Sequence, residues 1–379
     1  MGARTELAWI LVGNPDNRRI VGFREALATR GQPELAVLSH EQLLSDPSAL
    51  LALPDEPATV RIDSVGESTQ VEQALLEWGY EARAAEGVEP TRPRLVEHGE
   101  VLAPRQQHLG FLRYLGALSL VFRARPSWRL MVSPASIALS FDKSRACAAY
   151  RALGVPVPEA FEVPTESVLR SRSTRDGLIE LMRGREVEQV FVKLRSGSSA
   201  SCLCALSARG YGMTTLERSG ERWYNSLRVR RVEGEKLEAV LAFLVGEGAH
   251  VERAERKARL AGAYFDCRVL MIANEPAFTV VRQSRHPITN LHLGGWRGDV
   301  ELLRERLGPG AWDRAMESCL RVMEYHAAFH LGLDVMFETD FSRHRIIESN
   351  AFGDLIPNSR RDGRTVYEWE IEEWVRLSG

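Results

Sequence analysis

Three oxygen-bearing side chains near the end of the sequence could form a site for a divalent cation. Asp334 follows the apolar run 331–333, and Glu348 and Asn350 stand two residues apart at the end of the next apolar run. Residues two apart on a strand project to the same face, and Asp334 joins them if the two strands pair in register. Two carboxylates and an amide carbonyl suit Mg²⁺, which leaves its other positions to substrate phosphates. Alternatively, all three are solvent-facing polar residues at strand ends.

Lysine is scarce in this chain, and its positions are therefore informative. Only Lys143, Lys193, Lys236 and Lys257 are lysine among 49 basic residues, so a retained lysine can mark a place where a guanidinium would not serve. Lys143 opens a predicted helix, and Lys193 lies in the apolar strand F-V-K-L, where an ammonium group costs free energy unless an anion meets it. The small, polar segment 195–201 that follows could close its backbone N–H groups over phosphates.

Predicted helices and strands alternate along the chain and would carry these residues. An apolar strand over 7–12 leads into an amphipathic helix that ends at Gly31, and Gly79 ends a second predicted helix, 71–78. The turn after the first strand lacks G-x-G-x-x-G, so a dinucleotide site is not indicated there. The later elements are a hairpin, a long helix, two strands and a closing helix, over 267–272 with 277–282, 312–331, 333–337, 345–347 and 367–377. This order predicts a mixed α/β fold.

Length and composition limit the function classes. At roughly 150 residues per domain, 379 residues predict two or three domains. The net charge of −2 gives no electrostatic reason to expect nucleic acid or an anionic membrane as a partner, and no apolar run approaches the roughly 18 residues of a membrane span. Five cysteines, an odd number, favour free thiols in a reducing compartment, so we expect a cytoplasmic protein.

Six short motifs follow one another between residues 133 and 357: D-K…L-G-V-P-V-P, F-V-K-L, D-C-R-V-L, N-L-H-L-G-G, L-G-L-D and E-S-N. Their order and spacing resemble the ATP-grasp superfamily, in particular carboxylate–amine ligases such as glutathione synthetase and the ribosomal-protein glutamate ligases. The resemblance implies two α+β subdomains that clamp ATP, preceded by an α/β pre-grasp domain. On this division the pre-grasp domain covers 1–130, the central subdomain 131–204 and the C-terminal subdomain 205–379, with an insert at 205–245.

The resemblance also implies roles for individual residues. The lysines at 143 and 193 would contact the ATP phosphates, and Glu255 would hold the ribose. The backbone of a hinge strand at 251–254 would bind the adenine edge, at a position defined to within one or two residues. Arg268 and Arg282 would stabilise charge on the transferred phosphoryl group and on the tetrahedral intermediate. The implied cofactor-binding residues are Lys143, Lys193, Ser196, Gly197, Ser198, Glu252, Arg253, Ala254, Glu255 and Asn290, and the implied Mg²⁺ ligands are Asp334, Glu348 and Asn350.

Some features depart from the family pattern. The phosphate loop has a single glycine, Gly197, where the family often has more. The connection from Asp334 to Glu348 is slightly long, and another alignment would make Asp340 the metal ligand; Asp334 is preferred because it follows 331–333, the family's entry to that strand. The 205–245 insert is either a solvated hairpin or an element that covers or recruits the substrate.

Other residues have metal-like spacing. His326 and His330 stand four apart on a predicted helix, but the residues between them do not complete an H-E-x-x-H pattern, so packed or surface histidines are the simpler interpretation. A single C-x-C, formed by Cys202 and Cys204, is a weak metal signal. Candidate substrate contacts beside the predicted phosphate site are His286 and His292.

The resemblance implies an ATP- and Mg²⁺-dependent ligase. One substrate's carboxylate would attack the γ-phosphate to give ADP and an acyl phosphate, and an amine would then displace phosphate to form an amide. A small-molecule kinase and a nucleotide-binding regulator without turnover are the alternatives. The expected partners are small-molecule or peptide carboxylates and amines, and a homodimer follows from the resemblance alone.

Overall fold

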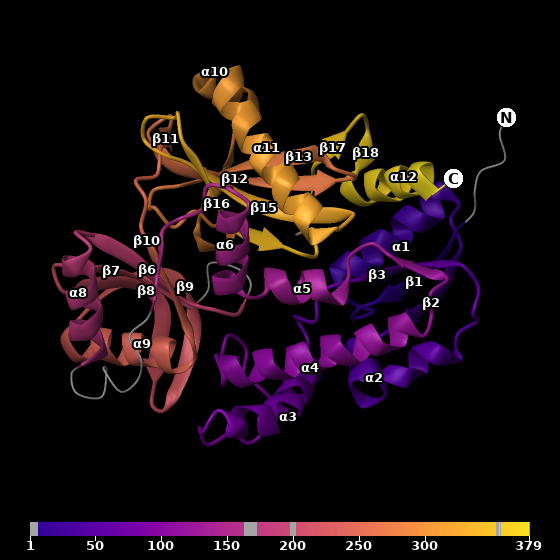
Figure 1. The fold of residues 1–379 in the computed structure, drawn as a ribbon, viewed down its shortest axis with the longest axis horizontal. Helices are drawn as coiled ribbons and strands as arrows, with labels where there is room; N and C mark the ends of the chain where they lie inside the picture. Colours follow the sequence, from indigo (N-terminus) through magenta and orange to yellow (C-terminus); the bar gives the residue numbers. More distant parts are fainter. Residues whose placement is uncertain (1–6, 163–172, 198–201, 354–355, 357, 379) are drawn as a thin grey trace.

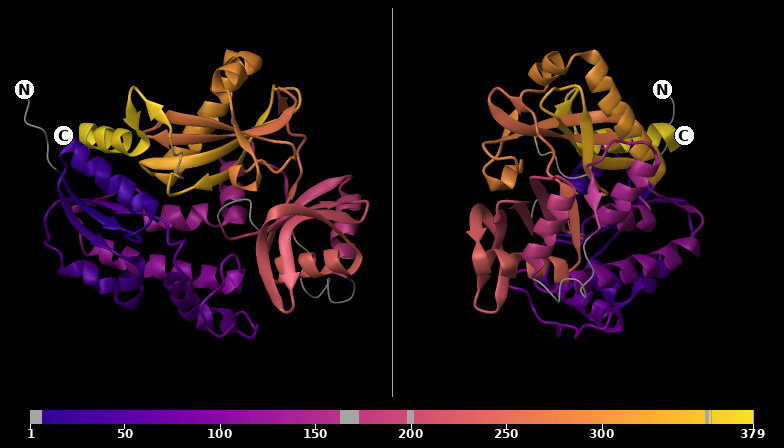
Figure 2. Two further views of the ribbon diagram at one scale, coloured as in Figure 1. Left: turned by 180° about the vertical axis from the view of Figure 1, so that it is seen from behind. Right: turned by 60° about the vertical axis from the view of Figure 1, so that its left-hand side comes forward.

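The computed structural model describes residues 7–162, 173–197, 202–353, 356 and 358–378, which form three lobes of a mixed α/β fold (Figures 1 and 2). The N-terminal lobe is built on a parallel sheet in the order β2-β1-β3-β4. Figure 1 shows α1 on one side of this sheet and α2 to α4 on the other. Its elements are β1 (Ala8–Val12), α1 (Arg18–Arg30), β2 (Glu34–Leu38), α2 (His40–Ser45), the 3-10 helix η1 (Pro47–Ala52), β3 (Ala58–Ile62), α3 (Thr69–Ala85), α4 (Pro104–Arg123) and β4 (Trp128–Leu130).

Gly79 does not end a helix, contrary to the prediction, because it serves a helix–helix contact. α3 continues through it, and a Cβ built on Gly79 would lie 1.9 Å from the Gln106 carbonyl oxygen of α4. Gly110 of α4 lies equally close to α3, since a Cβ built on Gly110 would be 1.9 Å from the Leu75 carbonyl oxygen. The close approach requires both glycines, at a cost to each helix of about 1 kcal/mol relative to alanine.

The central lobe is a six-stranded sheet in the order β5-β10-β6-β7-β8-β9. Its elements are β5 (Ala160–Phe161), α8 (Thr174–Gly184), β6 (Gln189–Leu194), β7 (Leu203–Ser207), β8 (Tyr211–Ser219), β9 (Arg222–Glu233), α9 (Gly234–Gly246) and β10 (Ala249–Arg253). The boundary expected between residues 204 and 205 falls inside β7. Because β7 to β9 complete the sheet that β6 and β10 begin, we propose that residues 205–245 belong to the central lobe and that the boundary follows β10.

The C-terminal lobe is an antiparallel sheet in the order β14-β13-β12-β15-β16, with β11 beside β12. The predicted strand pairs are confirmed, whereas the helix predicted over 312–331 ends at His326 because Ala327 takes a left-handed φ of 47°. The elements are β11 (Arg259–Leu260), β12 (Ala263–Ile272), β13 (Glu275–Ser284), η2 (Leu291–Leu293), β14 (Trp296–Gly298), α10 (Val300–Leu307), α11 (Pro309–His326), β15 (His330–Phe337), β16 (His344–Asn350), β17 (Arg360–Arg361) and β18 (Arg364–Thr365).

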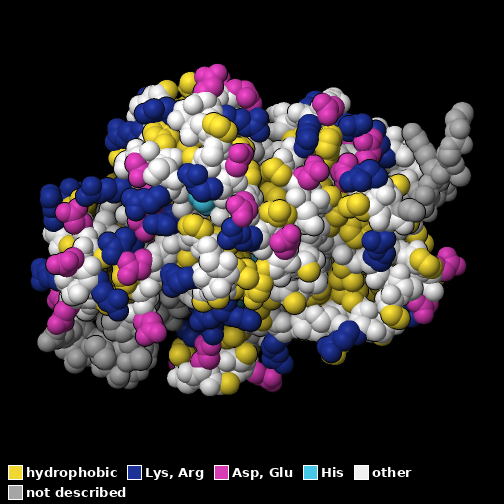
Figure 3. All heavy atoms as spheres, turned by 45° about the horizontal axis from the view of Figure 1, so that its top comes forward, with side chains coloured by type: hydrophobic (Ala, Val, Ile, Leu, Met, Phe, Trp, Pro, Cys, Tyr) yellow, Lys and Arg dark blue, Asp and Glu magenta, His cyan; other side chains and the backbone are white. Residues whose placement is uncertain are grey.

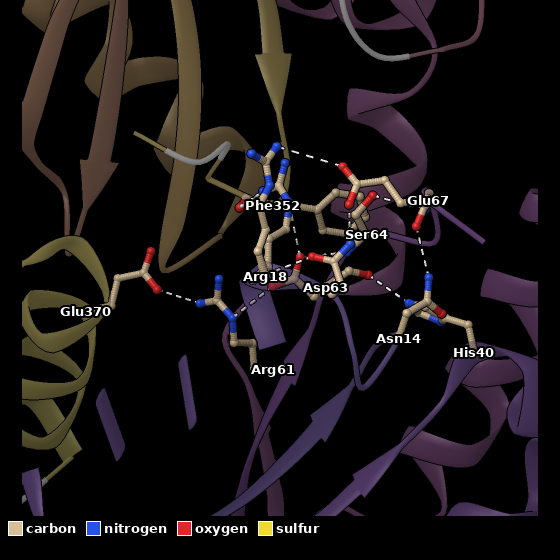
Figure 4. Close-up of polar contacts among 12 residues, drawn as sticks. Asn14, Arg18, His40, Arg61, Asp63, Ser64, Glu67, Phe352 and Glu370 are labelled. Carbon is tan, nitrogen blue, oxygen red and sulfur yellow. Dashed lines mark hydrogen bonds and ion pairs between the residues drawn. The ribbon is translucent and has the colours of Figure 1, made fainter. Parts of the chain in front are cut away.

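Three helices join the lobes. α5 (Pro134–Ser140) and α6 (Lys143–Ala152) contact β16 of the C-terminal sheet, and α12 (Val366–Ser378) packs against α1 of the N-terminal lobe. On α12, Trp374 donates its indole N–H to Thr59 Oγ1 at 2.8 Å. Glu370 accepts a hydrogen bond from the fully buried Arg61 of β3, as drawn in Figure 4. We call Arg61, Asp63 and Glu370 the junction cluster.

The molecular surface mixes charges of both signs. On the face drawn in Figure 3, lysine and arginine side chains are interspersed with aspartate and glutamate, in keeping with the net charge of −2. Within the described ranges, each helix is too short or too polar to cross a membrane.

Candidate active site

One face of the C-terminal sheet is apolar and the other is charged, because strand residues alternate. Cys267, Val281 and Val335 lie in the core on the apolar side, where α11 packs. On the other side, Arg268 of β12 lies opposite Asp334 of β15, as paired residues of neighbouring strands. The residues of this side that define what we call the charged face are Asp266, Arg268, Arg282, Asp334 and Glu348.

Register brings the predicted metal ligands together, as the hairpin argument requires. Asp334 pairs with Glu348, and Gly332 pairs with Asn350, whose side-chain amide lies 3.4 Å from the Gly332 carbonyl oxygen. Asp334, Glu348 and Asn350 all line one cavity of about 530 Å³. Their carboxylate and amide oxygens therefore share a wall of that cavity.

Two arginines hold Asp334 ionised. Arg268 donates to both carboxylate oxygens, and Arg282 Nη2 lies 2.9 Å from Oδ2. Burial alone would raise the pKa of Asp334, but the two guanidinium groups outweigh it and hold that pKa well below its usual range. Arg282 also donates to Asp266 Oδ1 at 2.7 Å, so the charges form one connected row.

The central lobe supplies the opposite wall of the cavity. On β6, Val190, Val192 and Leu194 face the core, whereas Phe191 and Lys193 line the cavity. The Lys193 ammonium meets the anion that its position in the strand demands, since it donates to Glu252 of β10. Burial would raise the pKa of Glu252, but Lys193 and His250 outweigh burial and lower it to about 2.

Lys143 links three parts of the site. It is the first residue of α6, its Nζ donates to the Gly197 carbonyl oxygen, and the same nitrogen lies 3.4 Å from Glu348 Oε1. The two predicted lysines and the predicted metal ligands, which come from separate elements, therefore line one cavity.

Most of the predicted nucleotide residues reach this cavity, but two do not. Gly197, Glu252, Arg253, Glu255 and Asn290 line it. Ser196 is buried beside Asp142 and does not line the cavity. Ala254 lines a neighbouring cavity instead, and its backbone N–H donates to the Gln189 carbonyl oxygen. The predicted Ser198 lies outside the described residues.

The other residues that the sequence singled out are Asp340, His286, His292 and His326. Asp340, the alternative metal ligand, is exposed and lines a different cavity. Its Oδ2 lies 3.6 Å from Arg343 Nε. His286 is exposed and lines a neighbouring cavity, and no side-chain position is described for His292. His326 is buried, and its ring nitrogens contact Ser136 Oγ at 2.7 Å and Tyr150 Oη at 2.6 Å, which indicates a packing role.

A third lysine belongs to the site and was not assigned from the sequence. Lys257 lines the cavity, donates to Thr289 Oγ1 at 2.7 Å and lies 3.3 Å from Asp266 Oδ2. Burial lowers the pKa of Lys257, although Asp266 opposes this effect. The scarcity of lysine is the sequence signal that could have identified Lys257. Three of the four lysines line the cavity, and the fourth, Lys236, lies on α9.

The described residues were also searched for groups of side chains with the chemistry of a metal site. In the parts of the chain that the structure describes, no three His, Cys, Asp or Glu side chains are grouped to hold a metal ion. Cys202 and Cys204 are buried free thiols, and burial raises the pKa of each to about 12.

No protein-family model and no curated protein sequence matches the chain, but solved structures do. The ATP-grasp ligase PsnB, complexed with a minimal precursor, superposes with a TM-score of 0.56 at 15% identity, over 99% of this chain and all of PsnB. A RiPP-associated ATP-grasp ligase of Chryseobacterium gregarium gives 0.56 at 9% identity, over 98% and 97% of the two chains. D-alanyl-alanine synthetase A of Vibrio cholerae gives 0.51 at 10% identity, over 98% of each. The chain therefore has the ATP-grasp fold.

Proposed function

We propose that the protein is an ATP- and Mg²⁺-dependent ligase that joins a carboxylate to an amine through an acyl phosphate and releases ADP and phosphate. The observation that carries this proposal is the convergence of Lys143, Lys193, Arg268, Arg282 and Glu348 on one cavity between lobes. Among the described residues that line it, nine side chains are cationic and six are anionic. This excess suits a polyphosphate together with a carboxylate substrate.

We propose that the base of the nucleotide lies at the central-lobe end of the cavity, where Phe191 offers an apolar surface. Phe191 of β6 and Met336 of β15 line the cavity from opposite lobes, and Phe191 pairs with Glu252 of β10, the strand that also carries Arg253. The Arg253 N–H is already donated to the Glu159 carbonyl oxygen. We therefore assign adenine recognition to residues beyond Ala254 or to carbonyl oxygens of the hinge.

The phosphates would lie between the lysines and the charged face. Lys143 and Lys193 would neutralise phosphate oxygens, and Arg268 and Arg282 would stabilise charge that develops on the transferred group. Glu348 and Asn350 offer a carboxylate and an amide oxygen, which fit Mg²⁺. Asp334 would join them only if it released Arg268 or Arg282, because these two arginines contact both of its carboxylate oxygens. When bound there, Mg²⁺ would supply charge neutralisation and would orient the phosphates.

Turnover assays with substitutions test this proposal. We expect ADP release when the enzyme is supplied with pooled carboxylates and amines. Inorganic phosphate should appear only when an amine is present. Lys193→Ala and Glu348→Ala should each abolish ADP release, whereas Lys236→Ala, on exposed α9 surface, should not. Full activity in either cavity variant would refute the site. Phosphate retained on the product without an amine would indicate a kinase instead, and nucleotide binding without turnover would indicate a regulator.

A further inference from the structure

A buried histidine behind the cavity wall has no part in the proposed function. His250 of β10 is 4% exposed and does not line the cavity, yet it pairs across the sheet with Lys193 of β6. Its Nδ1 lies 3.2 Å from Ser144 Oγ, and its Nε2 lies 3.1 Å from Glu252 Oε2. Because both ring nitrogens have a partner, the imidazole is held in one orientation.

Glu252 determines where the proton of this ring lies. The pKa of Glu252 is lowered to about 2, so its carboxylate is ionised at neutral pH and can only accept hydrogen bonds. His250 Nε2 therefore carries a proton and donates it to Glu252. In the neutral ring Nδ1 is then an acceptor, and the Ser144 hydroxyl donates to it. The hydrogen bonds thus run in one direction, from Ser144 through His250 to Glu252.

Glu252 connects His250 to one of the two phosphate lysines. Its Oε2 accepts from His250, and its Oε1 accepts from the Lys193 ammonium group. The last torsion of a glutamate side chain is broad, so one held oxygen is needed to direct the other at a partner. An ammonium group has three N–H donors, so the bond to Glu252 leaves others for phosphate oxygens.

Ser144 supplies the fixed end of this chain of hydrogen bonds. It lies in the first turn of α6, directly after Lys143. Asp142 caps this turn and accepts two hydrogen bonds of 2.8 Å from Arg195, which follows β6. The turn that anchors His250 is therefore itself tied to the central sheet.

We propose that His250 is a positioning residue that, from its anchor on Ser144, holds Glu252 and thereby the Lys193 ammonium group in place for the phosphates of a bound nucleotide. This inference rests on the nucleotide site of the proposed function and goes beyond it, because His250 acts only through Glu252. A histidine that merely filled space could be replaced by any side chain of similar volume, whereas a positioning histidine needs its hydrogen bond to the carboxylate.

Three substitutions at one position separate these two roles. His250→Gln can place an amide N–H near the former Nε2 and keep the bond to Glu252. His250→Asn can place an acceptor near the former Nδ1 and keep only the bond to Ser144, and His250→Leu removes both bonds. His344→Leu is the matched control, since His344 is also buried, contacts Ser318 Oγ at 2.8 Å and lies outside the cavity.

Calorimetric titration with ADP and with adenosine, both with Mg²⁺ present, isolates the phosphate contacts. We expect His250→Leu and His250→Asn to raise the Kd for ADP at least tenfold and to change the Kd for adenosine less than twofold. His250→Gln should stay within threefold of the unsubstituted protein for both ligands. In the ADP-release assay, KM for ATP should follow the Kd for ADP. His344→Leu should lower Tm and leave both Kd values unchanged.

The outcomes separate this inference from the proposed function. An unchanged Kd for ADP in His250→Leu, equal losses in His250→Gln and His250→Asn, or a parallel rise in the Kd for adenosine would overturn the positioning role. If His250→Leu fails to fold, the comparison of His250→Gln with His250→Asn decides. ADP binding that differs among the variants as expected, without ADP release from any pool of carboxylates and amines, would support the positioning role and overturn the ligase proposal. Absence of ADP binding by the unsubstituted protein would overturn both.

Discussion

The cavity and the junction between lobes each contain buried ionic side chains, but the two clusters differ in charge balance. Around the charged face, Lys257, Arg268 and Arg282 pair with Asp266 and Asp334, and the described residues that line the cavity carry nine cationic and six anionic side chains in all. In the junction cluster, the cation Arg61 meets two carboxylates, Asp63 and Glu370. Only the first cluster opens on the cavity.

The ionic side chains at the cavity can bind a ligand, whereas those of the junction cluster stabilise the fold. Buried charged groups with shifted pKa values occur in both regions, so burial and pairing by themselves would not identify the site. An excess of cations among the described side chains that line the cavity is the distinguishing feature, because an anionic ligand can supply the missing charge.

Removal of the junction cation should have the largest effect. Arg61→Met removes the only cation among the described residues that is seen to hydrogen-bond the buried Glu370. We therefore expect the free energy of unfolding to fall by about 3–5 kcal/mol. Urea denaturation measures this. The double variant Arg61→Met/Glu370→Leu should recover most of the loss, because it also removes the buried anion. A loss of ADP release with unchanged stability would contradict the structural role.

Removal of a cation on the charged face should instead affect turnover. Arg282→Ala is expected to lower the rate of ADP release by about 10²–10³-fold, or about 3–4 kcal/mol in the barrier. The free energy of unfolding should fall by no more than about 2 kcal/mol, because Asp266 keeps Lys257 and Asp334 keeps Arg268. Arg285→Ala, an exposed position just beyond the same strand, is the control. If stability collapsed while turnover per folded molecule persisted, the two clusters would not differ as described.

The two regions should also differ in the sign of their pH dependence. The pKa of Glu252 is lowered from 4.5 to about 2, so its contribution is present above pH 4.5 and is lost, up to about 3 kcal/mol, as pH falls toward 2. Burial raises the pKa of Glu370 despite Arg61, so its contribution is present below pH 4.5 and is lost as pH rises. Urea denaturation between pH 2.5 and 6 should show opposite changes in slope for Glu252→Gln and Glu370→Gln. Equal slopes would remove the distinction.

The parts of the site that the sequence predicts are those set by strand geometry. Alternation along β16 places Glu348 and Asn350 on one face, and the short connection after β15 brings Asp334 opposite them. Similarly, the alternation of β6 is visible in F-V-K-L, which places Lys193 apart from the buried valine and leucine. These relations depend on residues close in the chain, so the pattern contains them.

The parts that could not be predicted depend on contacts between distant segments. The contact between Ser144 and His250 joins residues 106 apart in the chain, and no local signal at either residue indicates it. Gly79 has the signature of a helix end, but a tertiary contact with α4 decides its role. Likewise, residues 205–245 complete a sheet only once β6 and β10 have paired.

The junction formed by α12 has a consequence for folding during synthesis. The cation in β3 and its carboxylate partner in α12 are separated by 309 residues, and the same helix supplies Trp374 to Thr59. The N-terminal lobe, which is translated before the other two, therefore lacks its covering helix, and its buried guanidinium lacks that counter-charge, until residues 366–378 have been translated. We expect the nascent lobe to be a client for chaperones throughout elongation, because contacts between remote segments form slowly and leave apolar surface open meanwhile.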